Sequence, residues 1–380
     1  EIDESGYDLA IYWGDETENK LSGSPRNSPE KYVHTYTDTE TKTITVHGDI
    51  GPFRLYHLSQ MQKNSILEIS SWGDAKIGFS NVFSGATNLT TLPAAPVITS
   101  NNFTGMFYGC TALDINLSSW NVSAVTNFTD TFKQATSFNN GGEQLNWNTS
   151  SATIMSSMFY QAAAFNQDIS NWDVTNVTRM DNMFSSALAF NNGGVALDWD
   201  YGFGSNANMA SMFFGATAFN QPIGNWNTSS VTNMSSMFQL AAAFNQNINN
   251  WNIDKVTSMQ RMFSGATNFN GELPTNRSYG VIPVLTNMGY MFYDAPAFNQ
   301  DVSVLNVTNV TYMQHAFTNA RAFNNADVPL NWGSETAKIT NWNNAFQNAS
   351  AFNNSGVEGW DMSSVTTMYR MFKNATSFDQ

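Results

Sequence analysis

The chain contains little charge, a single cysteine and no long apolar run. Charged residues make up 12% of the 380 positions, roughly half the usual share. One cysteine, Cys110, excludes an internal disulfide, and no apolar stretch is long enough to cross a bilayer. The polarity of the sequence therefore comes mainly from Asn, Ser and Thr, which carry hydrogen-bonding groups without a charge.

The charge that is present is mainly acidic. Lys and Arg number 16 against 30 Asp and Glu, so the net charge is −14. We therefore expect neither nucleic acid nor an anionic membrane surface as a partner, and no membrane insertion. An aromatic content of 14% is too high for a disordered chain. The opening residues 1–4 are already acidic, which favours a mature or excised segment of a longer protein.

A repeat of about 26 residues runs through most of the chain. A phenylalanine anchor recurs twelve times, and Phe or Leu follows each anchor by six positions. Ala, or Cys110 in one copy, stands three positions after the anchor. Such a unit cannot bury its apolar face alone, so the copies must stack as a solenoid. The anchors are Phe83, Phe107, Phe132, Phe159, Phe184, Phe213, Phe238, Phe263, Phe292, Phe317, Phe346 and Phe372.

Within one copy the pattern predicts a short helical segment and a brief strand. The apolar positions around one anchor are spaced as on one face of a helix. The alternation around Trp172 and Val174 then suits a strand. An Asn after the second Phe, such as Asn166, is expected to end the helical segment in the left-handed conformation. The apolar positions are Met155, Met158, Phe159, Ala162 and Phe165.

The N-terminal part carries no repeat and predicts a small β-rich cap. We expect strands at residues 7–13 and 41–47, joined by a polar loop that includes residues 22–25. The strings at residues 11–15, 34–36 and 43–46 resemble part of a PKD-like β-sandwich module. The chain thus divides into a cap at residues 1–65 and a solenoid of about twelve coils at residues 66–380.

The repeat resembles the BspA-like leucine-rich repeat family, also called DUF285, over residues 66–380. It departs from the family pattern at Leu305, which replaces Trp, and at residues 271–284, where the Trp position is lost. The resemblance implies an α/β repeat solenoid, a leucine-rich-repeat-like right-handed coil with parallel short strands and short helical segments. Members of that family are bacterial surface lipoproteins and adhesins, and some occur in unicellular eukaryotes. The residues that match in one copy are Ile169, Trp172, Val174, Val177, Thr178, Met180, Met183, Phe184, Ala187, Phe190 and Asn191.

A tryptophan recurs in most coils, and the residues on either side of it are the first candidate site. Regular spacing and the substitution by Leu305 favour an inward, structural tryptophan over a sugar-stacking stripe. The residues on either side of it then alternate to the open face. Their amides and carboxylates could bind polyols, a peptide or calcium, or serve only as a stabilising ladder. The candidate ligand-binding residues are Asn146, Asn171, Asp173, Asp198, Asp200, Asn225, Asn227, Asn250 and Asn252.

A second candidate lies two positions before the anchor, where the residue type varies freely. Arg261, Tyr290 and His315 occupy this position in consecutive coils, with Tyr293 and Tyr312 close in sequence. Tyr and Arg are favoured in contact surfaces, so these five residues predict a protein-contact patch. Scattered surface variation is the alternative.

Catalytic patterns are missing. The four histidines are far apart, and none has metal-ligand spacing or a nucleophile motif. We expect no enzyme, no catalytic residue and no resident cofactor, with calcium left open. The first functional hypothesis is an extracellular, ligand-binding domain of a bacterial surface adhesin that binds a glycan or protein on another cell. The second is a structural or homodimerising spacer module of a large surface protein.

Overall fold

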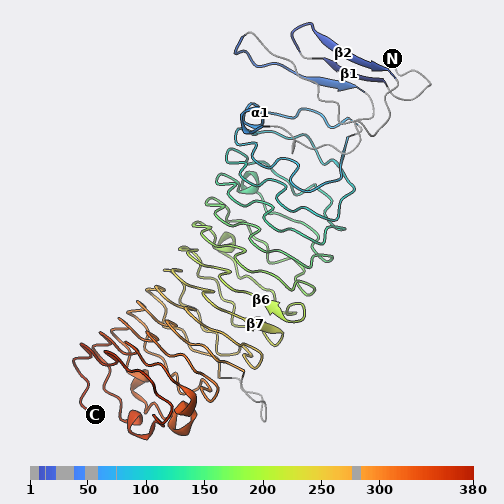
Figure 1. The fold of residues 1–380 in the computed structure, drawn as a ribbon. Helices are drawn as coiled ribbons and strands as arrows, with labels where there is room; N and C mark the ends of the chain where they lie inside the picture. Colours follow the sequence, from blue (N-terminus) through green and yellow to red (C-terminus); the bar gives the residue numbers. More distant parts are fainter. Residues whose placement is uncertain (1–7, 13, 23–37, 48–58, 74, 276–283) are drawn as a thin grey trace.

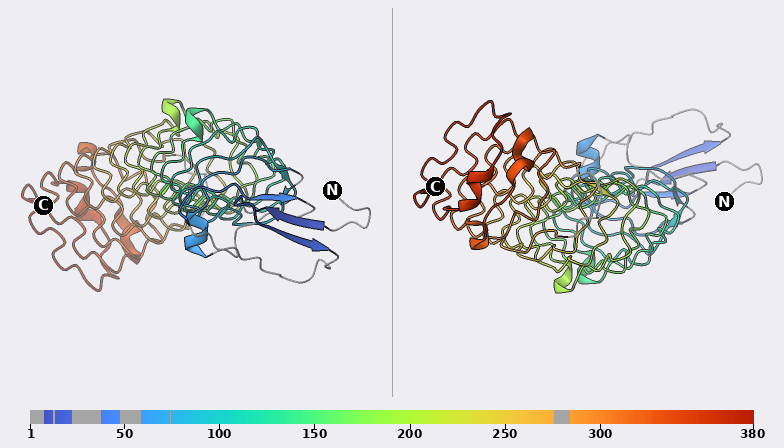
Figure 2. Two further views of the ribbon diagram at one scale, coloured as in Figure 1. Left: turned by 90° about the horizontal axis from the view of Figure 1, so that it is seen from above. Right: turned by 90° about the horizontal axis from the view of Figure 1, so that it is seen from below.

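The protein is a rod of stacked coils with a small sheet at its N-terminal end (Figure 1). The computed structural model describes residues 8–12, 14–22, 38–47, 59–73, 75–275 and 284–380. The sheet and the last coils lie at opposite ends of the stack in all three views (Figures 1 and 2). In the described part of the chain, no helix has the length and apolarity that a membrane span needs.

Three antiparallel strands form the N-terminal sheet, in the order β2-β1-β3. They are β1 (Asp8–Tyr12), β2 (Glu18–Ser22) and β3 (Thr45–His47). The first and third lie inside the two predicted strands, whereas β2 lies where the sequence predicted a polar loop. The string at residues 34–36 falls outside the described residues, so the PKD-like interpretation and the boundary at residue 65 stay predictions.

One short helix, α1 (Gln60–Asn64), precedes the first coil and is held by a capping box. The Ser59 side chain accepts a hydrogen bond from the Gln62 backbone, and the Gln62 side chain accepts one from the Ser59 backbone. Further short strands pair in parallel between coils. They are β4 (Lys76–Ile77) with β5 (Val97–Ile98), and β6 (Ala207–Asn208) with β7 (Val231–Asn233).

Elsewhere, each coil pairs with the next through a single parallel bridge. The bridge residue stands between the Thr and the Met of the repeat, as Arg179 does between Thr178 and Met180. The predicted strand at Trp172 and Val174 is therefore wrong. The Trp172 amide donates to Ile169 O at 3.1 Å within its own coil, so this segment is a turn. The bridged residues are Glu68, Thr91, Asn102, Asn127, Ile154, Arg179, Asn208, Asn233, Ser258, Asn287, Tyr312, Asn341 and Thr367.

The predicted helical segment is wrong as well, because the apolar stripe is a run of β-turns. The Met158 amide donates to Met155 O at 3.3 Å, and the Ala162 amide donates to Phe159 O at 3.0 Å. Each turn has a left-handed residue at its third position, Ser157 with φ 55° and Gln161 with φ 57°. Such turns place apolar residues three positions apart, which imitates the spacing of a helix face.

The amides that these turns leave free bond to the next coil. The Ser157, Phe159 and Gln161 amides donate to carbonyl oxygens one coil further on, at 2.9, 2.8 and 2.8 Å. An α-helix would need the same amides for bonds within its own segment. Stacking therefore provides hydrogen-bond partners for these backbone amides, so the conformation of each coil depends on the neighbouring coils.

Short 3-10 turns mark the places where a coil is lengthened. They are η1 (Asn140–Gly142), η2 (Asn192–Gly194), η3 (Asn325–Asp327), η4 (Gly333–Lys338) and η5 (Ser355–Gly359). The first two lie within inserted Asn-Asn-Gly-Gly strings, so these insertions fall in turns.

The core consists of stacked aromatic rings, and the inward position of the tryptophans is confirmed. Trp172 is 3% exposed, and its indole N–H donates to Leu145 O of the preceding coil at 2.9 Å. Phe159 and Phe184 of successive coils stack with ring centroids 5.6 Å apart. Cys110 is fully buried, and desolvation raises the pKa of its thiol to about 12. A thiol in this environment is a core residue and a poor nucleophile.

An asparagine ladder runs along the rod at the position after the second Phe. Asn166 Oδ1 accepts the Asn191 amide at 2.8 Å, and Asn191 Oδ1 accepts the Asn220 amide at 2.9 Å. Asn191 has φ −147°, so the predicted left-handed conformation is wrong. The role is nonetheless structural, because each side chain satisfies a backbone N–H of the next coil.

Candidate ligand-binding surface

The residues directly before the tryptophans form an exposed polar row, which we call the pre-tryptophan row. Each lies on a separate coil, one position before a buried tryptophan. Two of them touch, with Asn171 Nδ2 donating to Asn146 Oδ1 at 3.2 Å. The row is exposed throughout and consists of Asn146, Asn171, Asp198, Asn225 and Asn250.

Three of the residues directly after the tryptophans are engaged in their own turns, and Asp200 is exposed. Asp173 Oδ1 accepts both the amide and the hydroxyl of Thr175, at 2.9 and 2.6 Å. Asn227 Oδ1 makes the same pair of bonds with Ser229. Asn252 Oδ1 accepts the Asp254 amide at 2.9 Å. These side chains close Asx-turns and so are partly committed to the coil, whereas the pre-tryptophan row is more open to a ligand.

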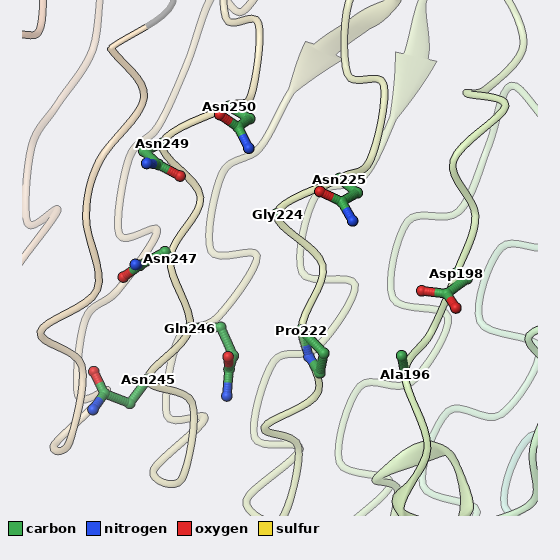
Figure 3. A pocket seen from close by; sticks show the side chains of 10 residues that line it. All are labelled: Ala196, Asp198, Pro222, Gly224, Asn225, Asn245, Gln246, Asn247, Asn249 and Asn250. Atoms are coloured by element: carbon green, nitrogen blue, oxygen red, sulfur yellow. The ribbon is translucent and has the colours of Figure 1, made fainter.

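Three members of the pre-tryptophan row border one hollow on the side of the rod. Figure 3 shows Asp198, Asn225 and Asn250 on three successive coils. The hollow has a volume of about 500 Å³ and is open to solvent. Its lining residues are Ala196, Asp198, Pro222, Gly224, Asn225, Asn245, Gln246, Asn247, Asn249 and Asn250.

The hollow exists because larger side chains of the repeat are missing there. In earlier coils, Gln144 Nε2 donates to Asp168 Oδ2 at 3.1 Å, and the Ser170 hydroxyl donates to Asp168 Oδ1 at 2.6 Å. Ala196 stands where Gln144 stands in its coil, and Pro222 and Gly224 stand where Asp168 and Ser170 stand.

Gly224 also permits a close approach of the next coil. A Cβ at Gly224 would lie 2.8 Å from Asn247 O, closer than a side chain allows. A larger residue would therefore push this coil away from its neighbour and distort the wall of the hollow.

Side chains on the far wall are held in place by neighbouring coils. Gln246 Nε2 donates to Asn220 O at 3.0 Å. Asn249 Nδ2 donates to Glu272 Oε2 at 2.8 Å, and Asn247 Oδ1 accepts the Glu272 amide at 3.0 Å. The wall is thus preorganised, and fixed polar groups lose little side-chain entropy when a ligand binds.

Sequence reasoning missed these wall residues. They follow no single repeat position, and their partners lie on another coil. The available signal was the departure of Pro222 and Gly224 from Asp168 and Ser170, which stand at the same positions of an earlier coil.

The second predicted site contains a column of stacked side chains. The Arg261 guanidinium lies 4.7 Å above the Tyr290 ring, and the Tyr290 and His315 rings stack at 4.6 Å with 14° between their planes. Tyr293 lies 5.7 Å from Tyr290 and 6.1 Å from His315. Tyr312 belongs to the bridge ladder and is 48% exposed. The structure thus brings together four of the five residues of the predicted protein-contact patch.

Two groups of this column, His315 and Tyr293, have pKa values shifted by their surroundings. Burial lowers the pKa of His315. The Asp294 carboxylate raises the pKa of Tyr293. Arg261, Tyr290 and His315 are half-buried and have φ between 57° and 60°, so the variable position is a left-handed turn position.

No group of three or more His, Cys, Asp or Glu that could hold a metal ion occurs among the residues that the structure describes.

Comparisons with known proteins give a family and only slight structural likeness. No curated protein matches the chain. A crystal structure of a TLR13–ssRNA13 complex is similar at 10% identity with a TM-score of 0.20, too slight to bear on the fold. That match covers 86% of this chain and 55% of the other, so the chain spans about half the length of that protein. The family described as "Mycoplasma protein of unknown function, DUF285" matches residues 56–145, 77–199, 197–282, 279–334 and 329–380. The chain therefore belongs to the DUF285 family.

Proposed function

We propose that this chain is an extracellular ligand-binding domain of a bacterial surface adhesin, and that it binds a glycan or a protein on another cell. The observation that carries the proposal is the hollow at Asp198, Asn225 and Asn250. It is concave, and polar groups of fixed position from three coils converge on it, as the polar groups that orient a ligand do. The proposal includes a right-handed, leucine-rich-repeat-like coil for the repeats and a partial PKD-like module for the cap at residues 1–65.

The chemistry of the lining supports a ligand rich in hydroxyl or amide groups. Side-chain amides both donate and accept hydrogen bonds, and the Asp198 carboxylate accepts charge-assisted ones. Acidic net charge, at −14, favours neutral or cationic ligands over anionic ones.

A binding assay with a matched control tests the proposal. The full chain is applied to a glycan array and to cells, beside a variant with Asp198→Ala, Asn225→Ala and Asn250→Ala. We expect this variant to lose about tenfold or more in affinity, because several direct hydrogen bonds disappear.

The control variant carries Asn146→Ala and Asn171→Ala. Both residues are exposed members of the same row but border the filled part of the surface. Equal losses in the two variants, or no binding of the unmodified chain to any glycan or cell, would contradict the proposal.

A self-associating spacer module is the second candidate, and the stacked column favours it. Arg261, Tyr290 and Tyr293 offer a cation and ring edges on one face, as homodimer contacts do. Analytical ultracentrifugation of the chain and of a Tyr290→Ala variant tests it. A concentration-dependent dimer that the variant lacks supports the spacer, and a monomer at high concentration rules it out.

A further inference from the structure

Tyr201 stands out among the exposed residues. Its side chain is 91% exposed, more than any other large apolar or aromatic side chain in the described ranges. It lies in a longer connection: the stretch from Trp199 to Phe213 exceeds the equivalent stretch from Trp226 to Phe238 by two residues. The other lengthened connection, at η4, folds into a 3-10 turn and presents no aromatic residue.

The turn that carries Tyr201 is fixed at both ends. The Gly202 amide donates to Trp199 O at 3.4 Å, and the Gly204 amide donates to Val177 O of the preceding coil at 2.9 Å. Gly202 has φ +93°, a conformation that other residues rarely adopt. The tyrosine is therefore held at a defined place on the rod despite its exposure.

The same turn lies against the coil that forms the middle of the hollow. A Cβ on Gly202 would lie 3.3 Å from Asn227 O and 3.4 Å from the Asn227 side chain. Asn227 follows the hollow residue Asn225 by two positions, and Asp198 precedes Tyr201 by three. The turn that carries Tyr201 thus lies next to the coils whose residues Asp198 and Asn225 line the hollow.

Resting on the ligand-binding function proposed above, we infer that Tyr201 and the hollow form one binding site for a neutral saccharide. The tyrosine ring supplies an apolar face for the C–H groups of a sugar ring. Asp198, Asn225 and Asn250 supply acceptors and donors for its hydroxyls. Aromatic contact beside convergent amide and carboxylate groups is the combination that a saccharide requires, since it has both kinds of surface.

The geometry of the rod suits a linear chain of sugar units. Successive coils are spaced about 4.8 Å apart, as paired strands are. Asp198, Asn225 and Asn250 therefore present one polar group per coil along a line. This spacing is close to the repeat of pyranose units in an extended oligosaccharide.

Other ligand classes fit the same residues less well. An anchored peptide side chain needs an apolar pocket, but Ala196 and Pro222 are the only apolar residues of the lining. Asp198 and Asp200 disfavour sialylated or sulfated glycans by charge repulsion. Tyr290 is no equivalent stacking face, because Arg261 and His315 cover its ring.

The test applies the full chain to a printed array of neutral and sialylated oligosaccharides, beside Tyr201→Ala and Tyr201→Phe. We expect binding to neutral oligosaccharides, a loss of about tenfold or more in Tyr201→Ala, and near-complete retention in Tyr201→Phe, which keeps the ring. The melting temperature of both variants should equal that of the unmodified chain, because Tyr201 is exposed. Tyr369→Ala, at an exposed tyrosine on a distant coil, is the control and should bind normally.

The outcomes separate this inference from the proposed function. If the chain binds cells or proteins but no neutral oligosaccharide, or if Tyr201→Ala binds oligosaccharides unchanged, the inference fails and the proposed function survives. If the unmodified chain binds neither oligosaccharides nor cells, both fail.

Discussion

At the residue scale, buried polar groups show how tightly each coil is tied to the one before it. The indole N–H of most core tryptophans donates to a carbonyl of the preceding coil, as Trp226 does to Leu197 O at 2.7 Å. Asn140 is fully buried, and its Oδ1 accepts the Leu117 amide at 2.7 Å. Trp342 differs, because its buried indole nitrogen has no hydrogen-bond partner in the described part of the chain. Buried tryptophans therefore differ in whether their indole N–H adds a hydrogen bond to the stability of the fold.

Two matched substitutions test how much the indole hydrogen bond contributes to the free energy of unfolding. Trp172→Phe removes the indole donor, and Leu145 O then keeps only its hydrogen bond from the Trp147 amide. We therefore expect a loss of about 1 kcal/mol beyond the loss of packing. Trp342→Phe removes a donor that is already unpaired, and the hydrogen-bond loss should be absent. Urea unfolding of both variants measures the difference; equal destabilisation would show that the indole bonds contribute little.

His315 predicts a pH dependence of stability. Burial lowers its folded-state pKa below the usual value of about 6.5. The unfolded chain then binds the proton more readily, so the stabilising contribution is complete above about pH 6.5 and is lost as the pH falls through the folded-state pKa. Melting temperatures from pH 8 to pH 5 should fall more steeply for the unmodified chain than for His315→Asn. Parallel curves would contradict this.

At the element scale, the turns of the apolar stripe place residues other than glycine in the left-handed region. Gln161, Asp294 and Asn319 occupy the same position two residues after the anchor. Leu240 occupies it as well, with φ +61° and 49% exposure. A leucine in this conformation is strained, because its Cβ crowds the following carbonyl.

Replacing Leu240 should therefore stabilise the protein. Leu240→Asn puts a residue that tolerates this conformation where Asn319 and Asn348 already stand in later coils. We expect a gain of about 1 kcal/mol in the free energy of unfolding. Leu188→Asn is the control, because Leu188 is 51% exposed but does not have positive φ. A similar effect of both substitutions would mean that removing an exposed apolar group is the cause.

At the scale of the whole molecule, stability is a sum of coil stabilities and coil–coil interfaces. Backbone bridges join each described coil to the next one in sequence, so the stack can open from one end. Cys110 lies in the second coil of the rod, fully buried beneath Phe83 O, toward which its thiol donates a hydrogen bond. This single thiol reports whether the N-terminal coils are closed.

Alkylation of Cys110 should therefore follow unfolding of that end of the rod. With its pKa raised to about 12, the thiol is protonated at pH 8 and shielded from solvent. We expect negligible labelling by iodoacetamide without denaturant, and labelling at urea concentrations below the midpoint of the global transition if the N-terminal coils open first. Labelling of the native chain within minutes would show that these coils are already open.

The stacking of twelve similar units, the inward tryptophans and the location of insertions in turns follow from the sequence by itself. Burial is the reason: a period of about 26 residues with apolar positions at constant offsets has to cover the same face in each copy. The conformation of the apolar stripe required the tertiary structure. Over the eleven residues from Met155 to Phe165, successive β-turns and a helix place the same residues on one face. Hydrogen bonds to the next coil decide between the two, and they join residues about 25 positions apart. The hollow depends on tertiary structure for the same reason, since Ala196, Pro222 and Gly224 leave space together only when their coils are stacked.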